Sequence, residues 1–277
     1  MYIDFHTHGK LAKYLPFSEE YTHWLFSEAR QAGLDALCLT EHFNTLGFGE
    51  LYRYIQQHSE RDGDTLLFSG LRIFPGMETD IAEGGHILSV GPMEAILELN
   101  QRLELNKKKG NFLTFEQLMD LYSQYPVLVG GGHPFREGGH IPELPLEQLS
   151  RLSFFDLNGK DLAENRLKTE ERTYWLGEQL AKPIVGGSDT HQAIQYGCIR
   201  TCFEQECNTV EQLYQEMLDG RYQIIISEFV SAQVKSAGML KRALKEINAL
   251  NGDYVSVLMG KGETPAVLSK KAKMIVS

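Results

Sequence analysis

Two histidines lie two positions apart at the end of the first apolar run of the chain. Residues 2 to 8 read YIDFHTH. In an extended strand, side chains at i and i+2 point to the same side, so His6 and His8 would present both imidazoles together. Neutral imidazole is a common ligand of zinc, manganese and iron. A His-x-His pair alone occurs in many proteins without a metal, so the prediction depends on what gathers near it.

More histidines and acids occur at the ends of later apolar runs. They are Glu41 and His42 after ALCLT, Glu78 after LRIFPGM, His86 before ILSV, His133 after VLVGGG, and Asp189 and His191 after PIVGGS. In a parallel barrel the strand ends share one rim, where active sites form. We therefore expect one cluster of imidazoles and carboxylates. A bridging carboxylate, for which Glu78 is the candidate, could hold two cations about 3.5–4 Å apart, a spacing suited to phosphoryl transfer.

Apolar runs alternate with helical periodicities along most of the chain, which predicts an α/β fold built on a parallel sheet or barrel. The expected strands are 2–5, 36–39, 66–74, 86–90, 127–129, 154–157, 183–185, 199–203 and 222–226. The expected helices cover about 19–32, 49–60, 114–125, 163–180 and 210–219.

The charge of the chain is unevenly distributed. The 277 residues carry a net charge of −10, of which residues 231–277 contribute +5, leaving −15 for the rest. An acidic body argues against binding to duplex nucleic acid, which depends on clustered cations. We expect a barrel domain over 1–230 and a basic extension over 231–277 packed on it; an anion-binding or partner surface is the alternative for the extension.

The chain begins without a basic region followed by an apolar core, and no segment approaches 18 uninterrupted apolar residues. We therefore expect a cytoplasmic protein that does not enter a membrane.

Six motifs, in chain order, resemble the polymerase and histidinol phosphatase (PHP) family of metal-dependent phosphoesterases: YIDFHTH, LCLTEH, FPGMETD, GGHILSVG, GGGHP and GGSDTH. The resemblance covers roughly residues 1–205. It implies a distorted (β/α)7 TIM-like barrel, two or three divalent ions (zinc, manganese or iron) and hydrolysis of phosphate esters by a metal-activated water. By position it implies His6, His8, Glu78 and Asp189 as ligands of a first metal, Glu78, His86 and His133 of a second, and His42 and His191 of a third.

Two positions depart from the family pattern. Lys13 and Tyr14 stand where the family usually has an Asp or His that completes the third site, and Glu41 replaces a commoner Asp. An ammonium repels a cation unless its pKa is strongly depressed, so a two-metal centre is the expectation. Lys13 could instead hold the substrate phosphate.

Other residues near the motifs are candidates for contact with substrate. His191 or His133 could protonate the leaving alkoxide, with Asp189 as a further catalytic candidate. Arg136 and Arg200 could contact phosphate oxygens. We expect a small phosphorylated substrate, with histidinol phosphate among the candidates. The alternatives are a nuclease or phosphodiesterase, a non-catalytic PHP-like binding module and an amidohydrolase; the oligomeric state is left open.

Overall fold

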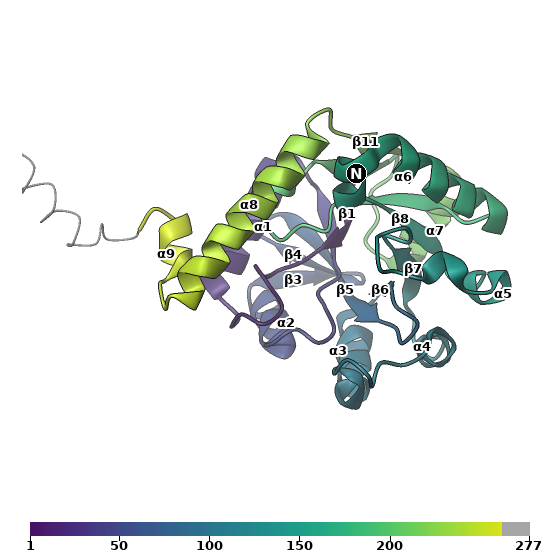
Figure 1. Cartoon of the computed structure of the whole chain (residues 1–277), viewed down its shortest axis with the longest axis horizontal. Helices are drawn as coiled ribbons and strands as arrows, with labels where there is room; N and C mark the ends of the chain where they lie inside the picture. The colour runs from purple at the N-terminus through teal and green to yellow at the C-terminus, as the bar shows by residue number, and fades with distance from the viewer. Residues whose placement is uncertain (262–277) are drawn as a thin grey trace, which may run out of the picture. The chain divides into compact units, whose positions relative to one another are not determined.

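The computed structural model describes residues 1–261, and in this part of the chain eleven strands form one sheet that curls into a nearly closed barrel (Figure 1). The strands run in the order β11-β10-β1-β2-β5-β6-β7-β8-β9, and β3 and β4 extend the sheet beside β5. Their bounds are β1 (Tyr2–Thr7), β2 (Ala36–Leu39), β3 (Ser59–Asp62), β4 (Thr65–Phe68), β5 (Leu71–Asp80), β6 (His86–Val90), β7 (Leu128–Gly132), β8 (Phe154–Asn158), β9 (Ile184–Gly187), β10 (Ile199–Phe203) and β11 (Tyr222–Ile226).

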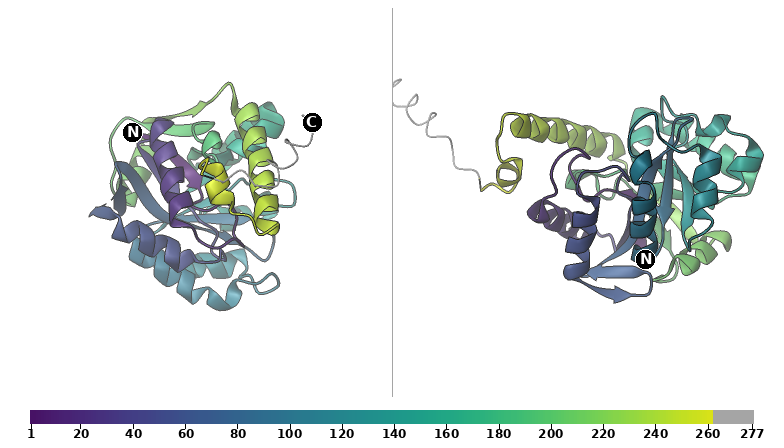
Figure 2. Two further views of the ribbon diagram at one scale, coloured as in Figure 1. Left: turned by 90° about the vertical axis from the view of Figure 1, so that its left-hand side faces the viewer. Right: turned by 90° about the horizontal axis from the view of Figure 1, so that it is seen from below.

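Helices α1 to α6 follow one another around the outside of this sheet (Figures 1 and 2). The helices are α1 (Glu19–Gln31), α2 (Phe48–Gln57), α3 (Met93–Arg102), α4 (Phe115–Tyr122), α5 (Leu146–Leu149), α6 (Gly159–Leu180), α7 (Val210–Leu218), α8 (Val230–Ala249) and α9 (Tyr254–Leu258). Thr114 and Thr209 begin α4 and α7 with capping boxes, in which side chains satisfy the free N–H groups of the first turn. The predicted TIM-like α/β barrel is confirmed.

The strands are not all parallel, which corrects part of the prediction. β1, β2 and β5 are parallel, as are β7, β8 and β9, but β6 runs antiparallel to both of its neighbours. Strands β10 and β11 are also antiparallel additions. Only residues 81–85 join β5 to β6, too few for the crossover that a parallel connection needs. The start of β6 therefore lies at the same rim as the end of β5, where His86 is paired with Asp80.

The single strand expected over 66–74 is a hairpin of β4 and β5. Ser69 and Gly70 both have positive φ, 49° and 81°, and turn the chain between the two strands. The Ser-Gly pair signals this turn, but the apolar residues on both sides of it, which belong to largely buried strands, make the segment resemble one strand.

The barrel closes between the first strand and the segment that follows β9. His8 N–H donates to the Thr190 carbonyl at 3.0 Å, and Asp189 N–H donates to the His6 carbonyl at 2.7 Å. Phe5 packs inside the barrel against Phe154 and Phe203, with ring centroids 5.7 and 6.0 Å apart. Closure thus brings the first ten residues beside positions 188–191.

The chain divides into two compact units, Met1–Ala237 and Gly238–Ser277. The division falls within α8. The predicted boundary at 230 and the packing of 231–277 stay predictions, and the basic residues Lys270, Lys271 and Lys273 lie outside the described residues. Among residues 1–261, none of the helices combines the length and apolar character needed to cross a bilayer.

Candidate metal centre

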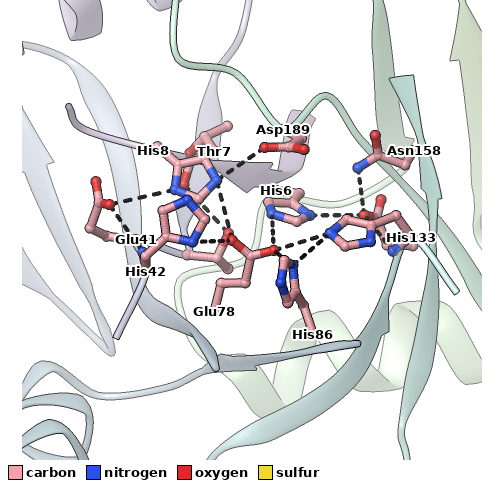
Figure 3. A network of polar contacts seen from close by, with 12 residues as sticks. His6, Thr7, His8, Glu41, His42, Glu78, His86, His133, Asn158 and Asp189 are labelled. Atoms are coloured by element: carbon pink, nitrogen blue, oxygen red, sulfur yellow. Dashed lines mark hydrogen bonds and ion pairs between the residues drawn. The ribbon is translucent and has the colours of Figure 1, made fainter. Parts of the chain in front are cut away.

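The carboxylate of Glu78, near the end of β5, lies among five imidazoles (Figure 3). One oxygen is 2.6 Å from His86 Nδ1, 3.1 Å from His133 Nε2 and 3.4 Å from His6 Nε2. The other is 2.7 Å from His42 Nδ1 and 3.6 Å from His8 Nε2. Glu78, the residue expected to be a bridging carboxylate, therefore lies at the centre of the cluster.

Three groups of side chains bring their donor atoms within 4.8 Å of one another, close enough to hold a metal ion. They are His6, His8 and Asp189; His6, Glu78 and His133; and His8, His42 and His191. The structure thus brings together all eight residues predicted as metal ligands, since His86 contacts Glu78 directly. Strands β1, β5 and β6 and the segments that follow β1, β2, β7 and β9 supply them.

Unsatisfied buried atoms in the cluster fit a cation. His6 Nε2 and His8 Nδ1 are buried and have no hydrogen-bond partner. Buried polar atoms are nearly always paired, because leaving one unpaired costs about 1–3 kcal/mol. Imidazole nitrogens and carboxylate oxygens are also the donors that zinc, manganese and iron accept. The residues present therefore suit divalent metal ions.

The electrostatics of the cluster follow from its burial. Burial opposes ionisation of Glu78, but the imidazoles of His86, His42 and His6 hold its pKa well below the usual range. Burial also opposes charge on His86, but the Glu78 and Asp80 carboxylates raise its pKa to about 10. At His133, burial and the Arg136 guanidinium lower the pKa to about 3. A carboxylate surrounded by bases of such different strength is typical of a functional site.

A carboxylate on β8, which the sequence analysis did not single out, orients His6. Asp156 Oδ2 lies 2.9 Å from His6 Nδ1 and accepts bonds from the His133 N–H and the Asn158 amide. A carboxylate accepts only, so His6 carries its proton on Nδ1 and turns Nε2 toward Glu78. One lone acid in the apolar strand FFDLN was the available sequence signal.

Other polar groups orient two further imidazoles. Glu41 lies 3.6 Å from His8 Nδ1 and accepts hydrogen bonds from the Gly9 and His42 N–H groups. His191 donates from Nδ1 to the Lys10 carbonyl at 2.9 Å, which turns its Nε2 toward Asp189, 3.9 Å away. Glu41, which was not assigned as a ligand, thus supports the cluster by orienting His8.

The backbone is strained where two of these side chains enter the site. His133 and Asp189 have φ values of 31° and 57°, in a region that residues other than glycine rarely adopt. Such conformations persist where the surrounding structure enforces them. Next to them, a Cβ on Gly187 would lie 2.3 Å from Asp156 Oδ1 and 2.5 Å from His6 Cβ, so this position requires glycine.

Arg136 lies at the edge of the cluster, as its position after His133 predicts. Its guanidinium is 2.8 Å from Asp189, 2.8 Å from Asp161 and 2.7 Å from Asn158. Lys160 lies 2.7 Å from the same Asp189 oxygen and was missed by the sequence analysis. Burial opposes ionisation of Asp189, but Lys160 and Arg136 hold its pKa well below the usual range.

The two remaining substrate-binding candidates lie in different places. Lys13 is at the rim, with Nζ 3.2 Å from Asn44 Oδ1 and 3.8 Å from Asp80, which in turn contacts His86. Arg200 is not brought to the cluster: its guanidinium stacks over the ring of Tyr2, at the start of β1. Alternation along β10 buries Ile199 and Thr201 and turns Arg200 outward.

No protein-family model and no curated protein matches the chain. Among solved structures, PsfC from Pseudomonas syringae matches with a TM-score of 0.72 and 25% identity, covering 88% of this chain and 98% of that one. The lesion-specific endonuclease PfuEndoQ from Pyrococcus furiosus matches with a TM-score of 0.58 and 15% identity over 81% of this chain and 58% of that one. An amidohydrolase from Chromobacterium violaceum matches with a TM-score of 0.51 and 14% identity, over 80% and 97%. The chain thus shares its fold with PsfC, an endonuclease and an amidohydrolase.

Proposed function

We propose that this protein is a metal-dependent phosphoesterase that hydrolyses a small phosphomonoester. The observation that carries the proposal is the shared contact of one buried carboxylate, Glu78, with five imidazoles at the rim of a barrel. A carboxylate in this position offers an oxygen to each of two adjacent cations and offsets their mutual repulsion. Histidinol phosphate is one candidate substrate.

We assign the ligands as the motifs and the geometry suggest. His6, His8, Glu78 and Asp189 would hold one ion, Glu78, His86 and His133 a second, and His42 and His191, with His8, a third where one binds. Bound divalent ions would supply a water whose pKa falls to about 7 and positive charge that neutralises the phosphoryl oxygens. Zinc, manganese and iron all suit this donor set.

The protein's own residues would position the phosphate. Arg136 already lies within 2.8 Å of Asp189, so its planar guanidinium borders the space next to the first ligand group. Guanidinium matches phosphate oxygens in paired hydrogen bonds. Lys160, at the same carboxylate, would add a second positive charge there. The side chains of Arg136 and Lys160 would then hold the phosphoryl group next to the metal ligands.

The proton for the leaving alkoxide would come from a histidine of the cluster. Because His191 donates its Nδ1 proton to the Lys10 carbonyl, only an imidazolium form could also donate from Nε2. His133 faces Glu78 and His86 through Nε2. Comparison of the His191→Gln and His133→Gln variants on esters with good and poor leaving groups would separate the two, since the variant that lacks the acid loses more on the poor leaving group.

The test of the proposed function is metal analysis together with phosphate release. We expect about two bound ions per chain and hydrolysis of small phosphomonoesters that rises with added Mn²⁺ or Zn²⁺. Glu78→Gln should lower the rate by about a hundredfold or more, as loss of a group that orients an ion or a transition state does. Glu143→Gln, at an acid that is 73% exposed and pairs with His140, is the matched control. A Glu78→Gln protein that keeps both its ions and its rate would contradict the proposal.

A nuclease is the second candidate, because the chain shares its fold with an endonuclease. That endonuclease has been solved with a 27-mer duplex carrying an abasic lesion. The charge of −15 on residues 1–230 weighs against a similar partner here. Activity on oligonucleotides that falls steeply with salt, as counterion release requires, together with none on small esters, would favour the nuclease.

A further inference from the structure

A hollow of about 340 Å³ lies beside the metal cluster, between residues 135–137 and the first half of α6. Arg136 forms the wall that the two share. Its Nη1 contacts Asp189 of the cluster, and its Nε contacts Asp161 of the hollow, each at 2.8 Å. One guanidinium group therefore separates the hollow from the metal ligands, and the volume is that of a pocket for a small molecule.

A break in α6 affects how the charged side chains around this hollow pair with one another. Asn165 has a non-helical conformation, φ −153° and ψ 89°, and its side chain accepts a hydrogen bond from the Lys168 N–H at 3.2 Å. In a continuous helix, Glu164 and Lys168 would be neighbours at i and i+4 and would pair. Within residues 1–261 Lys168 makes no ion pair, so the break leaves its ammonium available to the hollow.

Arg172 lines the hollow one helical turn beyond Lys168. Its guanidinium carbon lies 4.3 Å from the ring centroid of Phe135, and it makes no ion pair with any described residue. Stacking fixes the plane of the guanidinium and leaves its edge N–H groups for a ligand. Two cations one turn apart repel each other, and an anion between them would remove that repulsion.

Three acids and three cations line the hollow, but they are not held in the same way. Asp161 is already paired with Arg136. Glu137 and Glu164 are exposed, and within the described part of the chain neither is held by an ion pair. Lys168 is exposed as well, but the Arg172 guanidinium is held over the Phe135 ring, so the ordered charge of the hollow that lacks an ion pair among the described residues is positive.

We propose that this hollow binds the part of the substrate beyond the ester oxygen, and that this part carries a carboxylate held by Lys168 and Arg172. The inference rests on the proposed phosphoesterase function and adds the class of substrate. With the phosphoryl group at the cluster and Arg136 between the two, the substrate is a phosphorylated hydroxy acid of a few carbon atoms.

The experiment compares two esters that differ only at this group. In 3-phosphoglycerate the carbon skeleton ends in a carboxylate, and in glycerol 3-phosphate it ends in a hydroxymethyl group. Binding of each to the metal-loaded protein is measured by calorimetry and turnover by phosphate release. We expect the carboxylate to tighten binding by about tenfold, the usual worth of a hydrogen bond to a charged group.

Variants locate the effect. Lys168→Gln with Arg172→Gln should remove the preference for 3-phosphoglycerate and leave glycerol 3-phosphate unchanged. Arg166→Gln is the matched control, because this arginine of α6 pairs with Glu170 at 3.2 Å and does not line the hollow. The absence of a preference, a preference that survives in the double variant, or an equal loss on both esters would overturn the inference. Turnover of neither ester would speak against the proposed function, while the difference in binding would still decide the role of the hollow.

Discussion

The Nδ1 atom of His6 lies 2.9 Å from a carboxylate oxygen of Asp156, and both side chains are completely buried. The two residues come from β1 and β8, 150 positions apart. A buried carboxylate that accepts the proton of one imidazole nitrogen fixes the ring and strengthens the other nitrogen as a ligand. The pair links the barrel scaffold to the proposed metal centre.

Replacing Asp156 with Asn should weaken metal binding by about 10- to 100-fold, because the amide loses the charge that orients His6. Competition with a chelator of known affinity measures the change. Asp120→Asn serves as the control, since Asp120 is 66% exposed and pairs with Arg151 on the surface. Unchanged metal affinity in a folded Asp156→Asn protein would show that Asp156 does not support metal binding.

The stability of the metal-free protein should fall as the pH rises from about 6.5 to 10. The pKa of His86 in the folded protein, about 10, lies above its ordinary value of 6.5. The contribution of protonated His86 to the stability is therefore complete below pH 6.5 and is lost as the pH approaches 10. Allowing for its partial exposure, we expect a loss of about 1–2 kcal/mol. Urea unfolding at several pH values measures it.

The His86→Gln variant should show a flatter pH dependence over the same range. His133, with its pKa near 3, loses its contribution to stability only below pH 6.5, so it does not affect the range from pH 6.5 to 10. His140→Gln, in an exposed loop, is the control. With Zn²⁺ bound the trend should reverse, because ligand histidines must be deprotonated. An identical slope in His86→Gln and the unaltered protein would contradict the assignment.

Gly187→Ala should damage both stability and metal binding. The new Cβ would meet Asp156 and His6 Cβ at 2.3 and 2.5 Å, so one of them must shift. Overpacking of this kind costs about 1–3 kcal/mol. Calorimetric melting and metal titration measure the two effects. Gly49→Ala, in α2 with open space at its Cβ, should leave both unchanged.

Lys13→Ala should raise KM for the phosphoester by about tenfold with a smaller change in kcat, if its ammonium contacts the phosphate. Lys13→Arg should retain most of the affinity because the positive charge remains. Lys108→Ala, an exposed lysine, controls for the general loss of charge. A KM that is the same in Lys13→Ala and the parent protein would end this role.

Much of the site could be predicted because its residues sit at strand ends. The alternation of apolar strands with helices places His6, Glu78, His133 and Asp189 at one rim whatever the details of the loops. The prediction failed at two reversals of the chain, the first of which the Ser-Gly pair does signal. The turn at Ser69 and Gly70 lies between two buried strands, and the reversal of β6 depends on a five-residue connection.

One misplaced residue and one missed residue have a different cause. Arg200 is near His191 in sequence, but the alternation of β10 points it away from the barrel interior. Asp156 lies within an apolar strand, where a single acid reads as an irregularity. Its partner, His6, becomes apparent only when β1 and β8 are brought together by closure of the barrel.

The antiparallel direction of β6 also bears on the order in which the two halves of the site form during folding. Glu78 and His133 are 55 positions apart and are joined through β5, β6 and β7, which are neighbours in the sheet and follow one another in the chain, with α3 and α4 between β6 and β7. His8 and Asp189 are 181 positions apart and meet only when the two ends of the barrel join. Contacts of short sequence separation form first, so the half of the site around Glu78 is expected to be organised during folding before the half around Asp189.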